Sequence, residues 1–313
     1  MHALVWTLLL THVPGDWLAW GFSAHRWVNE AAIHALPDPL HEFFKSHQSW
    51  LVEHAVDADR RKHTVEGEDV KHYIDLDRYG QDQTQLKAVF PCGWQEAVEN
   101  WGEDVVRENG IGPWNAIWTY RKLVDAFASL DSALILRHAA DLGHYIGDLH
   151  VPLHTTENYN GQLTGQTGIH GLWETEVPER QISRYNLADV KMQPARDVSD
   201  WVWGIVFESH AAVDSVLRFE RELNVAWGDR PTYAYVERGR VQQRLRAPDF
   251  VDAYAEALNM QVERRMRNSV SRVAGAWWWA WVEAGEPDLT AIMTKSLPEV
   301  SPWKRFKMWL LGS

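Results

Sequence analysis

The sequence predicts an all-α protein folded as a single domain. Apolar residues recur at helical spacing over most of the 313 residues, whereas the apolar–polar alternation of half-buried strands is scarce. No internal repeat, low-complexity linker or sharp change of composition divides the chain. A chain of this length can bury a sufficient core as one helical unit.

Proline and glycine mark where the predicted helices end. The first ends at Pro37, another at Gly110 and a third at Pro152, all residue types that interrupt or cap helices. A polar, glycine-rich loop follows from Thr155 to Gly168, and a short helix begins near Ile169. The longer predicted helices cover residues 24–36, 94–109, 114–130, 132–150, 199–224 and 248–283.

Composition narrows the classes of function. A net charge of −12 argues against a broad basic surface that holds nucleic acid by neutralising phosphates. It leaves room for a nucleic-acid substrate, because bound metal ions can supply positive charge locally. Cys92 is the single cysteine, so an intrachain disulfide is excluded.

Residues 1–19 are expected to be a signal peptide. They contain an apolar run from Ala3 to Leu10, broken by Pro14 and Gly15, which resembles a short hydrophobic region before a cleavage site. Cleavage near Ala19 predicts a protein exported to the periplasm or the outside of the cell. An ordinary N-terminal helix is the alternative. Residues 20–313 form the predicted mature domain.

Residues 144–174 combine four histidines and three carboxylates. His144 and Asp148 are four residues apart on a predicted helix and therefore share one face. His170 and Glu174 repeat this spacing on the next helix. Imidazole and carboxylate ligands without thiolate suit zinc, although spacing alone would also allow iron or manganese. The order HxxxD and HxxxE is the reverse of the ExxH motif of di-iron bundles, which favours zinc.

Of the other polar residues near this segment, one is predicted to bind metal and three are not. His154 follows Pro152, where the chain can turn back towards the paired ligands. His138 and His150 lie six positions from the first ligand, about 240° around the helix, and are expected to face elsewhere. Glu157 is predicted to be a loop residue.

The N-terminal third supplies more candidate ligands. "KHYIDLD" offers His72, and "HAVDADRRK" offers Asp57 and Asp59. "WGFSAHR" places Trp20 and His25 at the start of the predicted mature chain.

Together these motifs resemble the superfamily that joins zinc-dependent phospholipases C with the single-strand-specific nucleases of fungi and plants. The similarity covers most of the chain from Trp20 to Glu174 and rests on helical character alone beyond that point. It implies an all-α fold with three zinc ions in a cleft. It also implies that the free α-amine and the carbonyl of an N-terminal tryptophan bind one of these ions.

The resemblance assigns ligands by position. It implies a first ion held by Asp59, His72, His144 and Asp148. A second ion would be held by Trp20, His25 and the bridging carboxylate of Asp148. A third would be held by His154, His170 and Glu174. Asp57 remains the alternative to Asp59, and cleavage after Ala19 would create the Trp20 amine.

The chemistry so implied is phosphoester hydrolysis. Two ions about 3.5–4 Å apart share a hydroxide that attacks phosphorus, and the third offsets charge on the phosphate oxygens. Asp59 and Asp148 serve this reaction as ligands. Arg61 or Lys62 is expected to assist in stabilising the transition state, with a solvated basic run as the alternative.

The substrate is expected to be single-stranded nucleic acid or a nucleotide. The five-residue spacing of Trp20 and His25 and the "HYID" context favour the nuclease branch, in which Tyr73 would stack on a base and Asp75 would hydrogen-bond to it. Solvated or capping acids are the alternative for Asp75. Glu174 is the ligand type of the phospholipases, so hydrolysis of phospholipid head groups is the alternative activity.

A non-catalytic, zinc-stabilised helical binding protein is the alternative from another class. The C-terminal segment "PWKRFKMWLLGS" mixes aromatic and basic residues, so it could contact a membrane surface, or it could pack as a terminal helix. No protein partner is implied.

Overall fold

The computed structural model describes residues 21–293, except 81, 195 and 239–240. Helices make up most of this part of the chain, which confirms the predicted class. Residues 1–19, predicted to be a signal peptide, as well as Trp20 and the C-terminal tail, lie outside the described residues.

The elements follow one another as a series of helices with one β-hairpin. The α-helices are α1 (Phe22–Ala35), α2 (Leu40–Ser46), α3 (Gln48–His54), α4 (Asp57–Arg61), α5 (Gln83–Val89), α6 (Trp94–Trp101), α7 (Glu103–Glu108), α8 (Gly112–Ala128), α9 (Ser132–Leu149), α10 (Ile169–Gly171), α11 (Val177–Gln181), α12 (Val198–His210), α13 (Val213–Trp227), α14 (Pro248–Ala257) and α15 (Gln261–Glu283). Short 3₁₀ turns cover Asp69–Lys71, Leu76–Arg78, Pro152–Thr155 and Ile182–Arg184, and a π-helical turn covers Leu172–Glu176. The strands are β1 (Tyr233–Arg238) and β2 (Val241–Arg246).

Three of the predicted helices are each two helices in the structure. Gly102 separates α6 from α7 with a φ of 83°, a backbone conformation that glycine adopts at little cost. Asn259 and Met260 separate α14 from α15, again with positive φ. The break between α12 and α13 falls at residues 211–212. These predictions of continuous helices were wrong because apolar spacing persists across each break.

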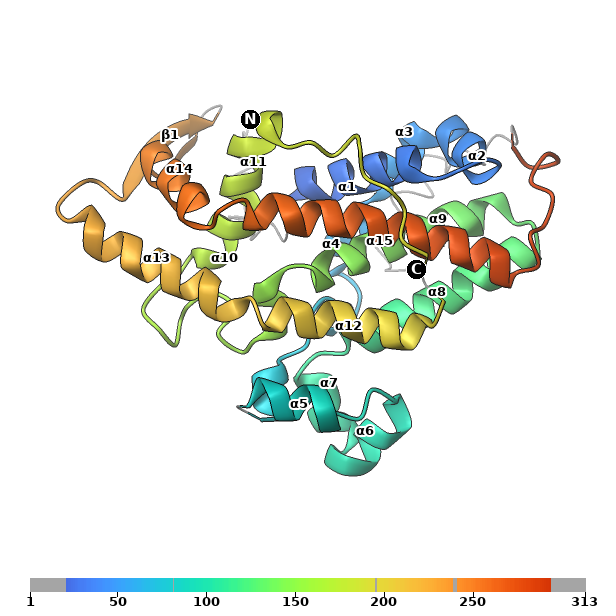
Figure 1. The fold of residues 1–313 in the computed structure, drawn as a ribbon, viewed down its shortest axis with the longest axis horizontal. Helices are drawn as coiled ribbons and strands as arrows, with labels where there is room; N and C mark the ends of the chain where they lie inside the picture. The colour runs from blue at the N-terminus through green and yellow to red at the C-terminus, as the bar shows by residue number, and fades with distance from the viewer. Residues whose placement is uncertain (1–20, 81, 195, 239–240, 294–313) are drawn as a thin grey trace, which may run out of the picture.

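The β-hairpin is an element that the sequence analysis did not predict. β1 and β2 pair antiparallel, with Tyr233 opposite Arg246 and Tyr235 opposite Arg244. Figure 1 shows β1 beside α14 at one end of the molecule, where α11 and α13 also lie.

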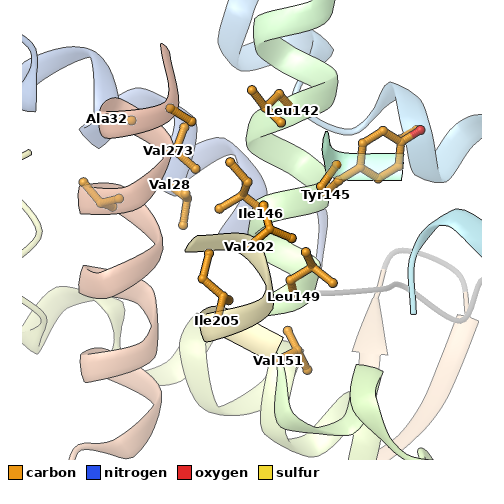
Figure 2. Close-up of a cluster of buried hydrophobic side chains, with 14 of the residues drawn as sticks. Val28, Ala32, Leu142, Tyr145, Ile146, Leu149, Val151, Val202, Ile205 and Val273 are labelled. Atoms are coloured by element: carbon orange, nitrogen blue, oxygen red, sulfur yellow. The ribbon is translucent and has the colours of Figure 1, made fainter. Parts of the chain in front are cut away.

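α9 is the central helix of the core. Every residue from Leu142 to Leu149 is buried, so this part of the helix has neighbours on all sides. Figure 2 shows Ile146 and Leu149 packed among side chains of α1, α12 and α15, including Val28 and Val273. A polar side chain on this stretch of α9 must therefore be compensated inside the protein.

α1 approaches α9 closely beside the candidate site. A Cβ atom added to Gly143 would lie 2.0 Å from Oδ1 of Asn29, so any larger residue would displace the buried Asn29 side chain. His25 lies one helical turn before Asn29, and His144 directly follows Gly143. The contact thus brings two predicted ligands from distant segments to one place.

α5, α6 and α7 form an excursion below the main body in Figure 1. Trp114 of α8 and Trp203 of α12 both donate to the carbonyl of Cys92, at 2.8 and 3.1 Å, which ties the excursion to the body. None of the described helices combines the length and apolar character that crossing a membrane requires.

Candidate metal centre

Three groups of buried histidine and carboxylate side chains could each hold a metal ion. Within each group, one ligand atom per residue lies within 4.8 Å of the others. The first group is Asp59, His72 and His144; the second is His25, His144 and Asp148; the third is His154, His170 and Glu174. All of these residues were predicted from the sequence, and Trp20, the remaining predicted ligand, lies outside the described residues.

Asp148 lies between the first and second groups. Its Oδ2 atom is 2.7 Å from Nδ1 of His72 and 3.2 Å from Nε2 of His144. Its Oδ1 atom is 3.4 Å from Nε2 of His25. Because the two oxygens face different histidines, this carboxylate can serve two ions at once.

Asp59 is the upstream acid that joins the first group. α4 places its Oδ1 atom 3.6 Å from Nε2 of His144 and 3.9 Å from Nδ1 of His72. Asp57 instead lies 2.5 Å from Nδ1 of His54 and accepts from Arg60 at 2.8 Å. The sequence did not decide which of the two acids joins the first group. In the structure Asp59 does, whereas Asp57 pairs with His54 and Arg60.

His25 enters the centre from α1. Its ring stacks on that of His144 with 3.8 Å between centroids and an interplanar angle of 22°. Just before α1, the backbone N–H of Gly21 donates to Oγ1 of Thr175 at 3.3 Å. Thr175 adjoins Glu174, so the start of the described chain is held beside the third group.

The third group is built on α10 and the π-helical turn after it. Nε2 of His170 lies 3.0 Å from Oε1 of Glu174, and Nε2 of His154 lies 3.3 Å from Oε2. π-helical turns are rare and often occur at functional sites. The i,i+4 pair predicted from the sequence therefore meets around a locally widened helix.

Backbone carbonyls orient three of the histidines. In each, Nδ1–H donates to a carbonyl, which fixes the tautomer and leaves Nε2 to face its group. The acceptors are Ala55 for His144 (2.9 Å), His72 for His154 (2.7 Å) and Tyr159 for His170 (3.1 Å). This arrangement is typical of metal-binding histidines.

The charges of the centre fit a cation. Asp59, Asp148 and Glu174 are buried, and Lys62 is the ammonium beside them, 2.7 Å from Oδ1 of Asp59. Oδ2 of Asp59 and Oδ1 of Asp148 make no hydrogen bond with any residue of the described chain. Buried carboxylates in excess of their cations are costly, and bound metal ions would offset that cost.

The pKa of His144 reflects the same excess of negative charge, whereas that of His72 does not. Burial disfavours the charged ring of His144, yet Asp148 and Asp59 raise its pKa to about 10. Burial and the ammonium of Lys62 instead lower the pKa of His72 to about 3, although Asp148 opposes this shift. Hence the first group favours one positive charge and keeps a neutral imidazole beside it.

The two basic residues after Asp59 face different surroundings. Nη2 of Arg61 lies 3.1 Å from Oε1 of Glu68 and 3.0 Å from Oδ1 of Asp141, neither of which belongs to the three groups. Lys62 contacts Asp59 directly, and Asp148 and Glu174 also help to raise its pKa although burial opposes this. Lys62 is therefore the basic side chain that borders the centre.

Tyr73 and Asp75 lie next to the third group. Ile74, between them, donates its N–H to the carbonyl of His154 at 2.9 Å. Burial, followed by the charges of Asp77 and Glu157, raises the pKa of Asp75 to about 7. Its carboxyl can therefore be protonated near neutral pH and can donate a hydrogen bond.

Tyr159 is a site residue that the sequence analysis missed. Its side chain is 53% exposed, and its ring meets that of His170 edge-on with 5.9 Å between centroids. Tyr73 donates its hydroxyl to the carbonyl of Glu108 at 3.2 Å. The sequence did contain a signal for Tyr159, because it is an aromatic residue in the polar loop between the predicted ligands His154 and His170.

His150 and Glu157, which were predicted not to bind metal, lie outside the three groups. His150 donates Nδ1–H to the carbonyl of Ile146 at 2.7 Å, and its Nε2 faces Arg272 at 3.4 Å. Glu157 pairs with Arg78 at 3.0 Å on the surface.

The fold and the site thus define a helical protein with three buried histidine–carboxylate groups that could bind metal ions. Neither the protein-family models nor the curated proteins compared with this sequence gave a match.

Proposed function

We propose that the chain is a zinc-dependent phosphoester hydrolase in which residues 20–313 form the active domain. The observation that carries the proposal is the position of Asp148, whose two oxygens face the first and second groups. A carboxylate shared in this way is the arrangement expected for a two-ion hydrolase.

The donor set supports zinc. The three groups offer imidazole nitrogens and carboxylate oxygens without a thiolate, and such donors suit zinc. Zinc ions held there would supply Lewis acidity and activate water for attack on phosphorus. A structural zinc site closes at four protein ligands, whereas the three groups here share eight side chains, fewer than four for each ion, so positions for substrate remain.

Lys62 has a separate role in this proposal. Its side chain is 20% exposed and reaches Asp59 at the border of the centre. An ammonium there can bind a non-bridging phosphate oxygen and stabilise negative charge that develops on it. Arg61 is held by Glu68 and Asp141 and is proposed to support the fold around the centre.

We favour a nucleotide or single-stranded nucleic acid as substrate. Tyr73 and Tyr159 offer aromatic rings beside the third group, and Asp75 offers a carboxyl that can donate or accept. Aromatic stacking with an adjacent hydrogen-bonding group suits a nucleobase. Phospholipid remains the second candidate, because Glu174 is the ligand type of the phospholipases.

Export completes the proposed site. Removal of residues 1–19 would free the α-amine of Trp20, one residue before Gly21. The hydrogen bond from Gly21 to Thr175 holds this end of the chain beside the centre, and His25 of the second group follows four residues after Gly21; both support the terminal amine as an additional ligand of the second group.

Metal analysis combined with a substrate comparison tests the proposal. The mature chain is expected to contain three zinc ions and to hydrolyse bis(p-nitrophenyl) phosphate in a reaction that EDTA abolishes and zinc restores. Three bound ions without chelator-sensitive hydrolysis would favour the structural-zinc alternative. Offering single-stranded DNA, a 3′-nucleotide and phosphatidylcholine side by side then identifies the substrate, and cleavage of the lipid alone would contradict our preference.

A further inference from the structure

One face of the β-hairpin combines tyrosine and arginine side chains. Residues directly opposite in an antiparallel pair share a face, so the register places Tyr233, Tyr235, Arg244 and Arg246 together. The Arg244 guanidinium lies 3.9 Å from the centroid of the Tyr233 ring. Tyr235 is 72% exposed, so its ring is available to a ligand.

The surroundings of this face are basic although the protein is acidic. Residues 218–246 contain seven arginines and four acids, a net charge of +3 in a chain of −12. Arg221, Arg230 and Arg244 are exposed, and none has an ion-pair partner among the described residues. Arg246 is buried, 3.4 Å from Oε1 of Glu220, and anchors the base of the hairpin.

A cavity of about 620 Å³ adjoins this face. It lies between the hairpin, α13 and residues 164–167, and Arg221, Asn224 and Tyr233 line it. Gln166 also lines it; its Nε2 donates to Glu220 at 2.6 Å, while its buried Oε1 has no hydrogen-bond partner in the described chain. The volume is within the range of small-molecule sites.

The hairpin is tied to the third metal group. The N–H of Arg246 donates to Oε2 of Glu176 at 3.0 Å, two residues after Glu174. The loop that lines the cavity through Gln166 also carries Tyr159, whose carbonyl accepts from His170. The base of the hairpin and the loop beside the cavity are therefore both connected to the third group.

We infer that Arg221, Tyr233, Tyr235 and Arg244, with the adjoining cavity, form a hairpin surface that binds single-stranded nucleic acid beyond the linkage being cleaved. This inference rests on the proposed phosphoesterase function and extends it to polymeric substrates. Guanidinium groups without an ion-pair partner suit phosphates, and the exposed ring of Tyr235 suits an unstacked base. Surface-bound membrane segments instead present an apolar face, which these residues do not form.

Binding to a hydrolysis-resistant oligonucleotide tests the hairpin surface apart from catalysis. The probe is a fluorescein-labelled phosphorothioate 20-mer of thymidine, titrated with the zinc-loaded mature chain at several salt concentrations. The Arg221→Gln/Arg244→Gln double variant is expected to lower the slope of log K against log salt by about 1.4, since each phosphate contact on a single strand contributes about 0.7. Tyr235→Ala is expected to weaken binding about 5-fold or more.

Arg107→Gln is the matched control, because Arg107 is a surface arginine of α7 on the excursion, distant from the hairpin in Figure 1, and pairs with Glu103. Hydrolysis of bis(p-nitrophenyl) phosphate should be the same in all variants. Unchanged oligonucleotide binding by the hairpin variants, with hydrolysis intact, would overturn the inference while leaving the proposed function in place.

Two further outcomes separate the alternatives. Hairpin-dependent binding of the oligonucleotide without hydrolysis of any phosphoester would support the surface and contradict the proposed function. Hairpin-dependent binding of phosphatidylglycerol vesicles, with no binding of the oligonucleotide, would overturn the assignment to nucleic acid.

Discussion

The imidazole rings of His25 and His144 stack face to face at 3.8 Å, although 118 residues separate them in the sequence. Each ring also lies within 3.4 Å of one oxygen of Asp148. This contact between α1 and α9 joins the first and second groups into one centre.

Replacing Asp148 is expected to disturb two ions at once. Asp148→Asn removes the charge that faces both His25 and His72, so the zinc content should fall from three towards one and hydrolysis should fall at least about 100-fold. Elemental analysis and phosphodiester hydrolysis measure the two effects. Asp125→Asn, at an exposed position of α8, is the control. Loss of a single ion in Asp148→Asn would show that the carboxylate is not shared.

Replacing Glu174 is expected to affect one ion alone. Glu174→Gln weakens the third group, in which the carboxylate contacts His154 and His170, while the first two groups keep their ligands. Two zinc ions should remain after dialysis, with hydrolysis lowered. If all three ions were lost together, the three groups could not be independent binding sites.

Gly21→Ala tests how the chain end reaches the centre. A Cβ atom at Gly21 would lie 2.8 Å from Cγ2 of Thr175, too close unless the Thr175 side chain or the chain at Gly21 shifts. Displacing Trp20 should lower the affinity of one zinc ion by about 10-fold, measured by competition with a chromogenic chelator. Gly204→Ala, where no heavy atom lies within 4 Å of the added Cβ, is the control. Equal zinc affinity in the two variants would argue against the Trp20 amine as a ligand.

Tyr73→Ala distinguishes the two candidate substrates. Loss of base stacking should raise KM for a single-stranded oligonucleotide about 10-fold and leave kcat on bis(p-nitrophenyl) phosphate unchanged. Steady-state kinetics on both substrates measure this. An equal loss on both would indicate a structural role for Tyr73, whose backbone packs against Gly110 and Gly112.

Glu68 is expected to make stability depend on acid pH. Burial disfavours its charge, yet Arg61 and hydrogen bonds from Lys71 and Tyr145 lower its pKa to about 2 from 4.5. Because the folded pKa is the lower one, the stabilisation is complete above pH 4.5 and is lost as the pH falls towards 2. Glu68→Gln should therefore cost ~3 kcal/mol at pH 7 and progressively less below pH 4.5.

Urea unfolding of the zinc-free wild type and variant at pH 7, 4 and 3 measures the difference, so that loss of metal does not contribute. A difference that stayed constant with pH would mean that the Glu68 carboxylate has the same pKa in the folded and unfolded chains.

Local sequence determined the helices and the paired ligands. The spacing of His144 with Asp148 and of His170 with Glu174 is a property of one helix turn, so it could be recognised without the fold. The break at Gly102 could not be predicted, because the apolar spacing continues across it. The backbone conformation at a glycine depends on the surrounding contacts as well as on the residue itself.

Tertiary structure decided which of several similar neighbours joins the centre. Asp59 and Lys62 face the ligands, whereas Asp57 and Arg61 face His54 and Glu68. The carbonyls that orient the histidines come from segments distant in the chain, as does the register of the hairpin. The sequence by itself therefore determined the helical class and the metal-ligand types. Packing between distant segments decided which carboxylate oxygen faces which imidazole ring. It also decided where the arginine-rich face of the β-hairpin lies, and local spacing encodes neither.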